Sequence, residues 1–146
     1  MDSEKSSDAA PAMAESIPRE LFRVPAIGDV WVNGLSNEYD ASTFPSQLEA
    51  YMTQEDYDKA LDTINQALHD LWPCVPCWST SYGCCVCTLG LSLYCAWGQV
   101  SEAETCTARQ IARVNRRACF KDRHITWRLE KSWLKHTSWL VISVVE

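Results

Sequence analysis

The chain has 146 residues, enough for one domain with a modest core, and its composition is ordinary except for seven Trp and eight Cys. Its net charge of −6 hides an asymmetry, because 14 of the 19 acidic residues lie in 1–70 whereas 102–146 carry nine of the 13 basic ones. The acidic N-terminus has no apolar run, which argues against a secretory signal or a mitochondrial presequence and favours the reducing cytosol over a disulfide framework.

The first part of the chain predicts a tail followed by a turn. Residues 1–27 are rich in Ser, Ala, Pro and acidic residues without periodicity, so we expect a disordered tail. The domain is then expected to occupy residues 28–146. It opens with a short strand over Val30–Val32 that ends in the turn signal Asn33-Gly34.

A helix is predicted to begin at Thr53, because Thr53-Gln54-Glu55-Asp56 has the form of a capping box. Apolar residues then recur at spacings of three and four, and Pro73 ends the pattern. This apolar stripe consists of Tyr57, Ala60, Leu61, Ile64, Leu68 and Leu71.

The segment 71–101 carries no charged residue and divides into two halves. The first half, 72–83, contains two prolines and a glycine, which exclude one regular helix. The second half, Cys84–Trp97, is densely apolar, but as a helix it would rise only about 21 Å, short of the roughly 30 Å hydrocarbon core. We therefore expect a shallow hairpin or an interfacial helix rather than a simple membrane span.

The remainder predicts one more helix and two strands. A second capping box at Ser101 should open a basic helix, on which Arg109, Arg113, Arg116 and Arg117 recur along one face. Residues 124–130 alternate, and 139–145 are almost continuously apolar, as in a central strand covered on both faces. The predicted class is α+β: a small antiparallel sheet packed with two or three helices, with a cysteine-rich, membrane-associated insert between helices.

The cysteines allow three interpretations. A zinc site could use the cluster Cys74–Cys87, which would make the chain a soluble cytosolic interaction module. Buried thiols account well for the isolated Cys106 and Cys119. S-acylation fits an apolar run beside a basic helix, because stable anchoring takes two signals, and we favour it. The acyl candidates are Cys74, Cys77, Cys84, Cys85, Cys87 and Cys95, none of which is needed for a metal in this interpretation.

The arginine face is either a solvated helix surface or a surface that meets an anionic leaflet, where each Arg adds on the order of 1 kcal/mol. Nucleic acid is disfavoured as a partner because the chain is acidic overall. No catalytic motif is present, and His69, His124 and His136 are scattered, so we expect neither an enzyme nor a cofactor nor a small-molecule substrate.

Several short motifs occur in an order that resembles the cysteine-rich hydrophobic domain (CHIC) proteins, which belong with golgin subfamily A member seven and the fungal Ras-palmitoylation accessory subunit. The motifs are Gly34–Tyr39, Phe44–Leu48, Ile64-Asn65, Gly83–Gly90, a basic helix, Trp127–Leu129 and a final apolar strand. The resemblance covers roughly residues 29–146.

The resemblance implies a small α+β domain on the cytosolic face of Golgi, vesicle and plasma membranes. It implies palmitoylation of the cysteine-rich segment, at Cys84, Cys85 and Cys87 and further at Cys74, Cys77 and Cys95. It also implies a non-catalytic role, as an accessory subunit that stabilises a DHHC palmitoyltransferase or as a trafficking factor.

Overall fold

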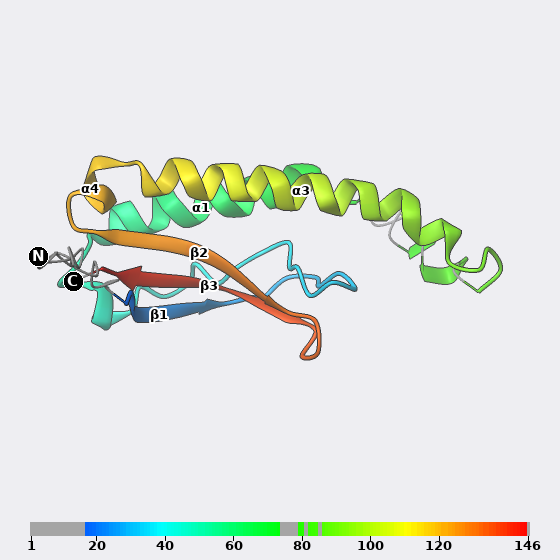
Figure 1. The fold of residues 1–146 in the computed structure, drawn as a ribbon, viewed down its shortest axis with the longest axis horizontal. Helices are drawn as coiled ribbons and strands as arrows, with labels where there is room; N and C mark the ends of the chain where they lie inside the picture. Colours follow the sequence, from blue (N-terminus) through cyan, green and yellow to red (C-terminus); the bar gives the residue numbers. More distant parts are fainter. Residues whose placement is uncertain (1–16, 74–78, 81, 85, 146) are drawn as a thin grey trace, which may run out of the picture.

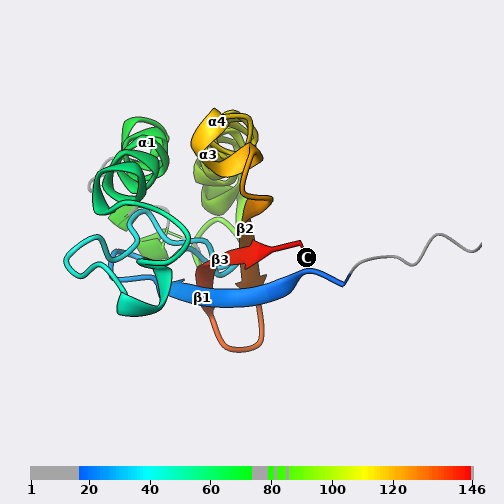
Figure 2. The ribbon, with the colours of Figure 1, turned by 90° about the vertical axis from the view of Figure 1, so that its left-hand side faces the viewer.

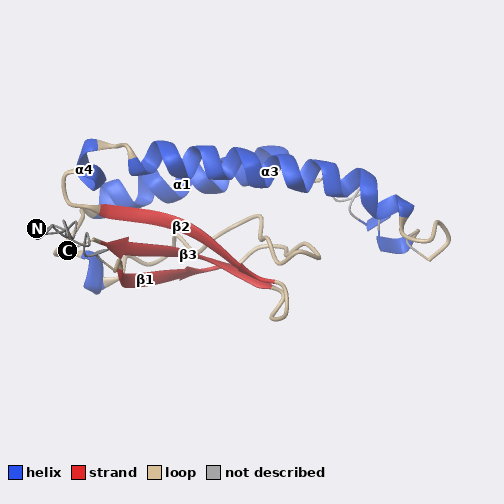
Figure 3. Ribbon diagram, viewed as in Figure 1, coloured by secondary structure: helices blue, strands red, loops and turns tan. Residues whose placement is uncertain are grey.

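The computed structural model of the chain describes residues 17–73, 79–80, 82–84 and 86–145. A sheet of three antiparallel strands in the order β1-β3-β2 lies against two helices, α1 and α3, which run side by side on one face (Figures 1 and 2). The elements are β1 (Arg19–Pro25), η1 (Ser46–Leu48), α1 (Gln54–Leu71), α3 (Leu91–Asn115), α4 (Ala118–Lys121), β2 (Ile125–Ser132) and β3 (Thr137–Val144) (Figure 3). The predicted α+β class, with a small antiparallel sheet and a few helices, is confirmed.

The last apolar run forms the central strand, as predicted. β3 pairs with β1 on one side and β2 on the other, so Val141 stands opposite both Arg23 and Arg128. Leu140 and Ile142 face the helices and are fully buried. In β2 the predicted alternation holds, because Ile125 and Trp127 are buried while Thr126 and Arg128 are exposed.

The expectation of disorder over 1–27 is wrong for Arg19–Pro25, which form β1. This strand pairs with β3 from Arg19 opposite Val144 to Pro25 opposite Trp139. Val24 is fully buried in the core. Composition misses the strand because its polar residues lie on the exposed face of the sheet and only a few apolar side chains are needed on the other face.

The segment before α1 is a compact turn rather than the predicted strand over Val30–Val32. Val30 makes only an isolated bridge to Ser36, while the Trp31 amide donates to the Leu35 carbonyl at 2.8 Å. The predicted turn at Gly34 is present, with φ of +87°. Trp31 and Leu35 are fully buried, so this turn belongs to the core.

The first predicted helix is confirmed at both ends. The Thr53 hydroxyl accepts a hydrogen bond from the Asp56 amide at 3.2 Å, as a capping residue should. The helix ends at Leu71, and Trp72 before Pro73 is extended. The apolar stripe is buried from Tyr57 to Leu68, so α1 is held mainly by its packing on α3, and the Tyr57 ring also contacts Trp127 of β2.

The second predicted helix begins ten residues earlier than expected. α3 runs unbroken from Leu91 to Asn115, so the expectations of a helix start at Ser101 and of a separate apolar insert up to Trp97 are both wrong. Ala96 and Val100 are buried, which shows that packing has already fixed the helix before Ser101 is reached. Leu91–Trp97 are therefore the first turns of a core helix. Among the described residues, no helix is both long and apolar enough to cross a membrane.

Candidate functional site

The distal end, which we define as residues 79–97, lies at the end of the molecule opposite α4 (Figure 1). Its first described part leads into a turn in which the Thr88 amide donates to the Cys84 carbonyl at 3.0 Å. Gly90, with φ of +87°, then precedes α3. Cys84 and Cys87 are both exposed free thiols in this turn. We call residues 84–90 the thiol turn.

Several large apolar side chains among the described residues of the distal end are exposed. Val86 is 85% and Leu89 is 95% exposed in the thiol turn, and Leu91 and Tyr94 follow on the first turns of α3 at 74% and 78%. Trp97 is half exposed. Single exposed apolar residues are normal on a protein surface, but a sequence-continuous group of this kind marks a site that meets another apolar surface.

Tyr82 joins the distal end to the core. Its ring packs edge-on against Trp31, with centroids 5.3 Å apart, and its hydroxyl hydrogen-bonds to the Val32 backbone. Burial raises the pKa of the Tyr82 hydroxyl above its ordinary value. The thiol turn therefore projects from an anchored base.

The predicted thiols divide into described and undescribed groups. Cys74, Cys77 and Cys85 lie outside the described residues, as does the side chain of Cys95 within α3. The alternative of a zinc site over Cys74–Cys87 depends on these residues and stays a prediction. Among the described residues, no group of three His, Cys, Asp or Glu side chains converges as metal ligands.

The two cysteines predicted to be buried are half-buried. Cys106 lies on α3 and lines an open groove against α1, and Cys119 lies on α4. Burial raises the pKa of the Cys119 thiol, which lowers its thiolate fraction at neutral pH. These thiols are less suited to modification than Cys84 and Cys87, which are exposed.

Three of the four predicted arginines share one exposed face. Arg109, Arg113 and Arg116 recur on the outward side of α3 and are exposed, and we call them the arginine row. Arg117 does not belong to it, because it is half-buried and donates to the Thr63 hydroxyl of α1 at 3.0 Å. Arg109 lies 18 residues after Leu91, about 27 Å along the helix. The arginine row and the thiol turn are thus separate features.

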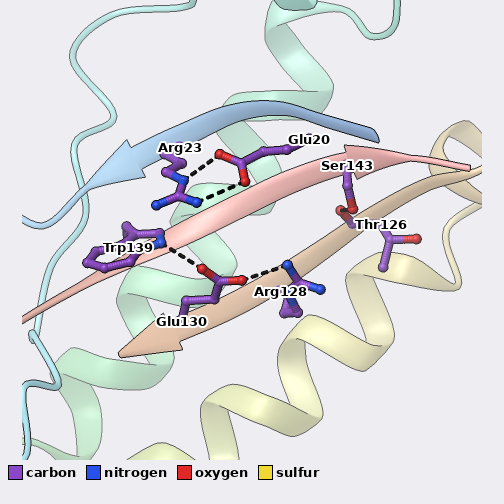
Figure 4. Close-up of polar contacts among 7 residues, drawn as sticks. All are labelled: Glu20, Arg23, Thr126, Arg128, Glu130, Trp139 and Ser143. Atoms are coloured by element: carbon purple, nitrogen blue, oxygen red, sulfur yellow. Dashed lines mark hydrogen bonds and ion pairs between the residues drawn. The ribbon is translucent and has the colours of Figure 1, made fainter. Parts of the chain in front are cut away.

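The exposed face of the sheet carries a paired polar network (Figure 4). Arg23 forms an ion pair with Glu20 and stacks over Trp139, 5.2 Å from its centroid. The Trp139 indole donates to Glu130 at 2.9 Å, and Glu130 also pairs with Arg128 at 2.6 Å. Because these groups satisfy one another, the network covers Val141 rather than offering free groups for chemistry.

Two helix asparagines perform a role that the sequence analysis did not identify. Asn65 of α1 accepts from the Tyr39 amide at 2.9 Å and donates to the Tyr39 carbonyl at 3.0 Å. Asn115 of α3 does the same for Trp127 of β2, at 2.8 and 3.0 Å. Each Asn side-chain amide thus makes the two hydrogen bonds, one to an N–H and one to a C=O of the same residue, that a neighbouring strand would make. In the sequence, the feature that could have indicated this role is an Asn beside the apolar stripe of each helix.

Two open grooves lie along α1, and polar and apolar side chains together line each of them. One, of about 380 Å³, lies between α1 and α3 and includes Thr63, Asp70 and Cys106. The other, of about 590 Å³, includes Glu38, Asp62, His69 and Asp70. Neither groove brings a thiol and a histidine together among the described residues, as a cysteine nucleophile would need.

The chain matches no protein-family model, no curated protein and no solved structure. The resemblance to CHIC proteins therefore rests on the motifs of the sequence alone.

Proposed function

We propose that the chain is a non-catalytic, S-acylated adaptor that attaches to the cytosolic face of Golgi, vesicle or plasma membranes. The observation that carries the proposal is the thiol turn, where Cys84 and Cys87 are exposed beside the exposed Val86 and Leu89. An acyltransferase needs an accessible thiol at the membrane surface, and apolar neighbours hold a segment there.

The energetic balance supports acylation over simple adsorption. The exposed apolar residues of the distal end give only partial, reversible insertion, because no more than a few side chains reach the acyl region. Each buried CH₂ of an acyl chain adds about 0.8 kcal/mol, so one or two chains would convert this weak contact into stable attachment. The arginine row begins about 27 Å along α3 from Leu91, so the thiol turn can contact a leaflet without it.

Acyl-biotin exchange in cells tests the attachment. One variant replaces Cys74, Cys77, Cys84, Cys85, Cys87 and Cys95 with Ser, and a matched control replaces Cys106 and Cys119. The first should lose its hydroxylamine-sensitive signal and move to the soluble fraction, and the control should retain both properties. A wild-type chain that gives no such signal and remains fully soluble would contradict the proposal.

The zinc alternative is separated by metal analysis of the purified chain. The zinc interaction module predicts about one zinc per chain, lost when Cys74 and Cys77 are replaced by Ser. The acylated adaptor predicts no stoichiometric zinc.

The proposed partner is a DHHC palmitoyltransferase that the chain would stabilise, or a component of trafficking machinery. This part of the proposal is supported by the resemblance to CHIC proteins and golgin subfamily A member seven. Co-purification with a panel of DHHC enzymes tests it. Failure to retain any of them would remove the accessory-subunit role while leaving membrane attachment in place.

A further inference from the structure

The turn that joins β2 to β3 exposes two large apolar side chains. Trp133 is 71% and Leu134 is 89% exposed, and they are followed by Lys135 and His136. The pairing of Ser132 with Thr137 closes the turn. We call residues 133–136 the hairpin turn. Turns of this kind are normally made of Asn, Asp, Gly and Ser, so adjacent Trp and Leu are not explained by turn formation.

The base of the hairpin turn is held firmly. Gly34 packs so closely that an added Cβ would lie 3.0 Å from the Ser132 carbonyl oxygen and 3.1 Å from that of Thr137. Lys131, one residue before the closing pair, forms an ion pair with Glu104 of α3 at 2.6 Å. Trp133 and Leu134 are therefore presented from a fixed position, away from the core.

The composition of the hairpin turn suits a lipid headgroup region. Trp resides at the interface between water and acyl chains, and Leu reaches further into the acyl region. Lys135 adds positive charge, and no acidic residue occurs between Lys131 and Val145. An anionic cytosolic leaflet attracts such a segment.

The position of the hairpin turn relates it to the thiol turn. The thiol turn lies at the end of the molecule opposite α4, whereas the hairpin turn projects from the sheet part of the way along the molecule, next to the Lys131–Glu104 ion pair (Figure 1). The exposed arginine row belongs to α3, on one side of the sheet, and the hairpin turn projects on the other side (Figure 2). A flat leaflet that meets both the thiol turn and the hairpin turn lies on the sheet side of the molecule, opposite the helix layer that carries the arginine row (Figures 1 and 2).

We propose that the hairpin turn is a second lipid contact, independent of acylation, which inserts Trp133 and Leu134 into the anionic leaflet that the thiol turn also meets. The inference rests on the membrane attachment proposed above and gives it an orientation. The arginine row then faces the cytosol.

Co-sedimentation of the purified, unacylated full chain with phosphatidylcholine vesicles, with and without phosphatidylserine, tests the contact. Trp133→Ser/Leu134→Ser should reduce partitioning about tenfold, since two apolar side chains are lost from the bilayer. Ile17→Ser is the matched control, because Ile17 is exposed beside β1 at the end of the sheet away from the hairpin turn. A triple variant, Arg109→Glu/Arg113→Glu/Arg116→Glu, should partition almost as the wild type does.

Three results would overturn the contact: no partitioning of the wild-type chain, equal partitioning of the hairpin variant, or loss of partitioning in the arginine variant alone. Hydrogen exchange supplies a second readout, because vesicles should slow exchange across residues 132–137. Slowing produced only by a solubilised palmitoyltransferase would assign the turn to a protein partner instead. Acylation in cells is scored separately, so the contact can fail while the acylated adaptor stands, and the reverse.

Discussion

Large apolar side chains are buried at the C-terminal end of α3 and exposed at its N-terminal end. In its C-terminal half, Ile111 and Val114 are buried against α1 and the sheet. In its first turn, Leu91 and Tyr94 are exposed, although the helix is continuous between them. The difference is one of partners, because the body of the domain ends before the helix does (Figure 1).

This comparison shows that apolar character alone does not identify a core. A core position needs a neighbouring element with a complementary face, and among the side chains of α3 that the structure describes, Ala96 is the first that belongs to the core. Apolar residues beyond that point stabilise the fold little. Their role must therefore be sought in contacts outside the described chain.

The largest expected effect on stability comes from comparing a Leu→Ala substitution in the core with one at the exposed start of α3. Leu61→Ala removes a fully buried side chain of α1 and should lower the free energy of unfolding by about 2–5 kcal/mol. Leu91→Ala, on the exposed first turn of α3, should change it by less than about 0.5 kcal/mol. Urea denaturation followed by circular dichroism measures both. Similar losses for the two variants would break the comparison.

Alkaline pH should lower the stability of the folded domain, because two of its buried residues are tyrosines. Burial raises the pKa of Tyr39 and of Tyr57 to about 12, against an ordinary value of 10.0. The folded chain therefore keeps protons that the unfolded chain has lost, so stability is complete below pH 10 and falls as the pH rises from 10 to 12.

Tyr57→Phe isolates one of these two groups. The Tyr57 hydroxyl is buried and has no hydrogen-bond partner among the described residues, so the variant should fold normally at pH 7. Its loss of stability between pH 10 and 12 should be smaller than that of the wild type by about 2 kcal/mol. Identical pH profiles for wild type and variant would refute the assignment.

The asparagine pairing sharpens what holds the body together. Asn115→Ala removes both hydrogen bonds to the backbone of Trp127 and should cost about 2 kcal/mol. Asn115→Asp keeps the acceptor and loses the donor, so its cost should be at least as large at neutral pH. Hydrogen exchange at the Trp127 amide should accelerate in the alanine variant, and unchanged protection there would count against the pairing.

The smallest expected effect separates two neighbouring arginines. Arg117→Ala loses its hydrogen bond to Thr63 and should cost about 1 kcal/mol. Arg116→Ala, on the exposed arginine row, should lie within about 0.5 kcal/mol of the wild type. Thermal unfolding of both variants under one buffer condition is sufficient. A larger loss for Arg116→Ala would place that residue in the body.

Periodicity in the sequence was enough to predict α1 and the two C-terminal strands, because Tyr57–Leu68 and Ile125–Leu129 carry their burial pattern locally. β1 was missed because its pairing with β3 joins residues more than a hundred positions apart. The continuity of α3 was missed because Ser101 resembles a helix start, and only packing on α1 shows that the helix is already formed there.

The candidate site was predicted in part. The exposure of Cys84 and Cys87 agrees with their choice as acyl candidates, but acylation itself stays a prediction. The departure of Arg117 from the arginine row could not be foreseen, because it depends on the distance between α1 and the end of α3. The hairpin turn was overlooked because Trp133 and Leu134 continue an apolar pattern in the sequence and become exposed only when the chain reverses.

The unbroken course of α3 has a mechanical consequence. A helix of 25 residues is about 37 Å long and resists bending, and its two ends belong to the distal tip and to the folded body. Attachment of the distal end therefore constrains the orientation of the folded domain as well as its position. Any binding surface on the rest of the domain would then lie at a constant distance and orientation from the point of attachment.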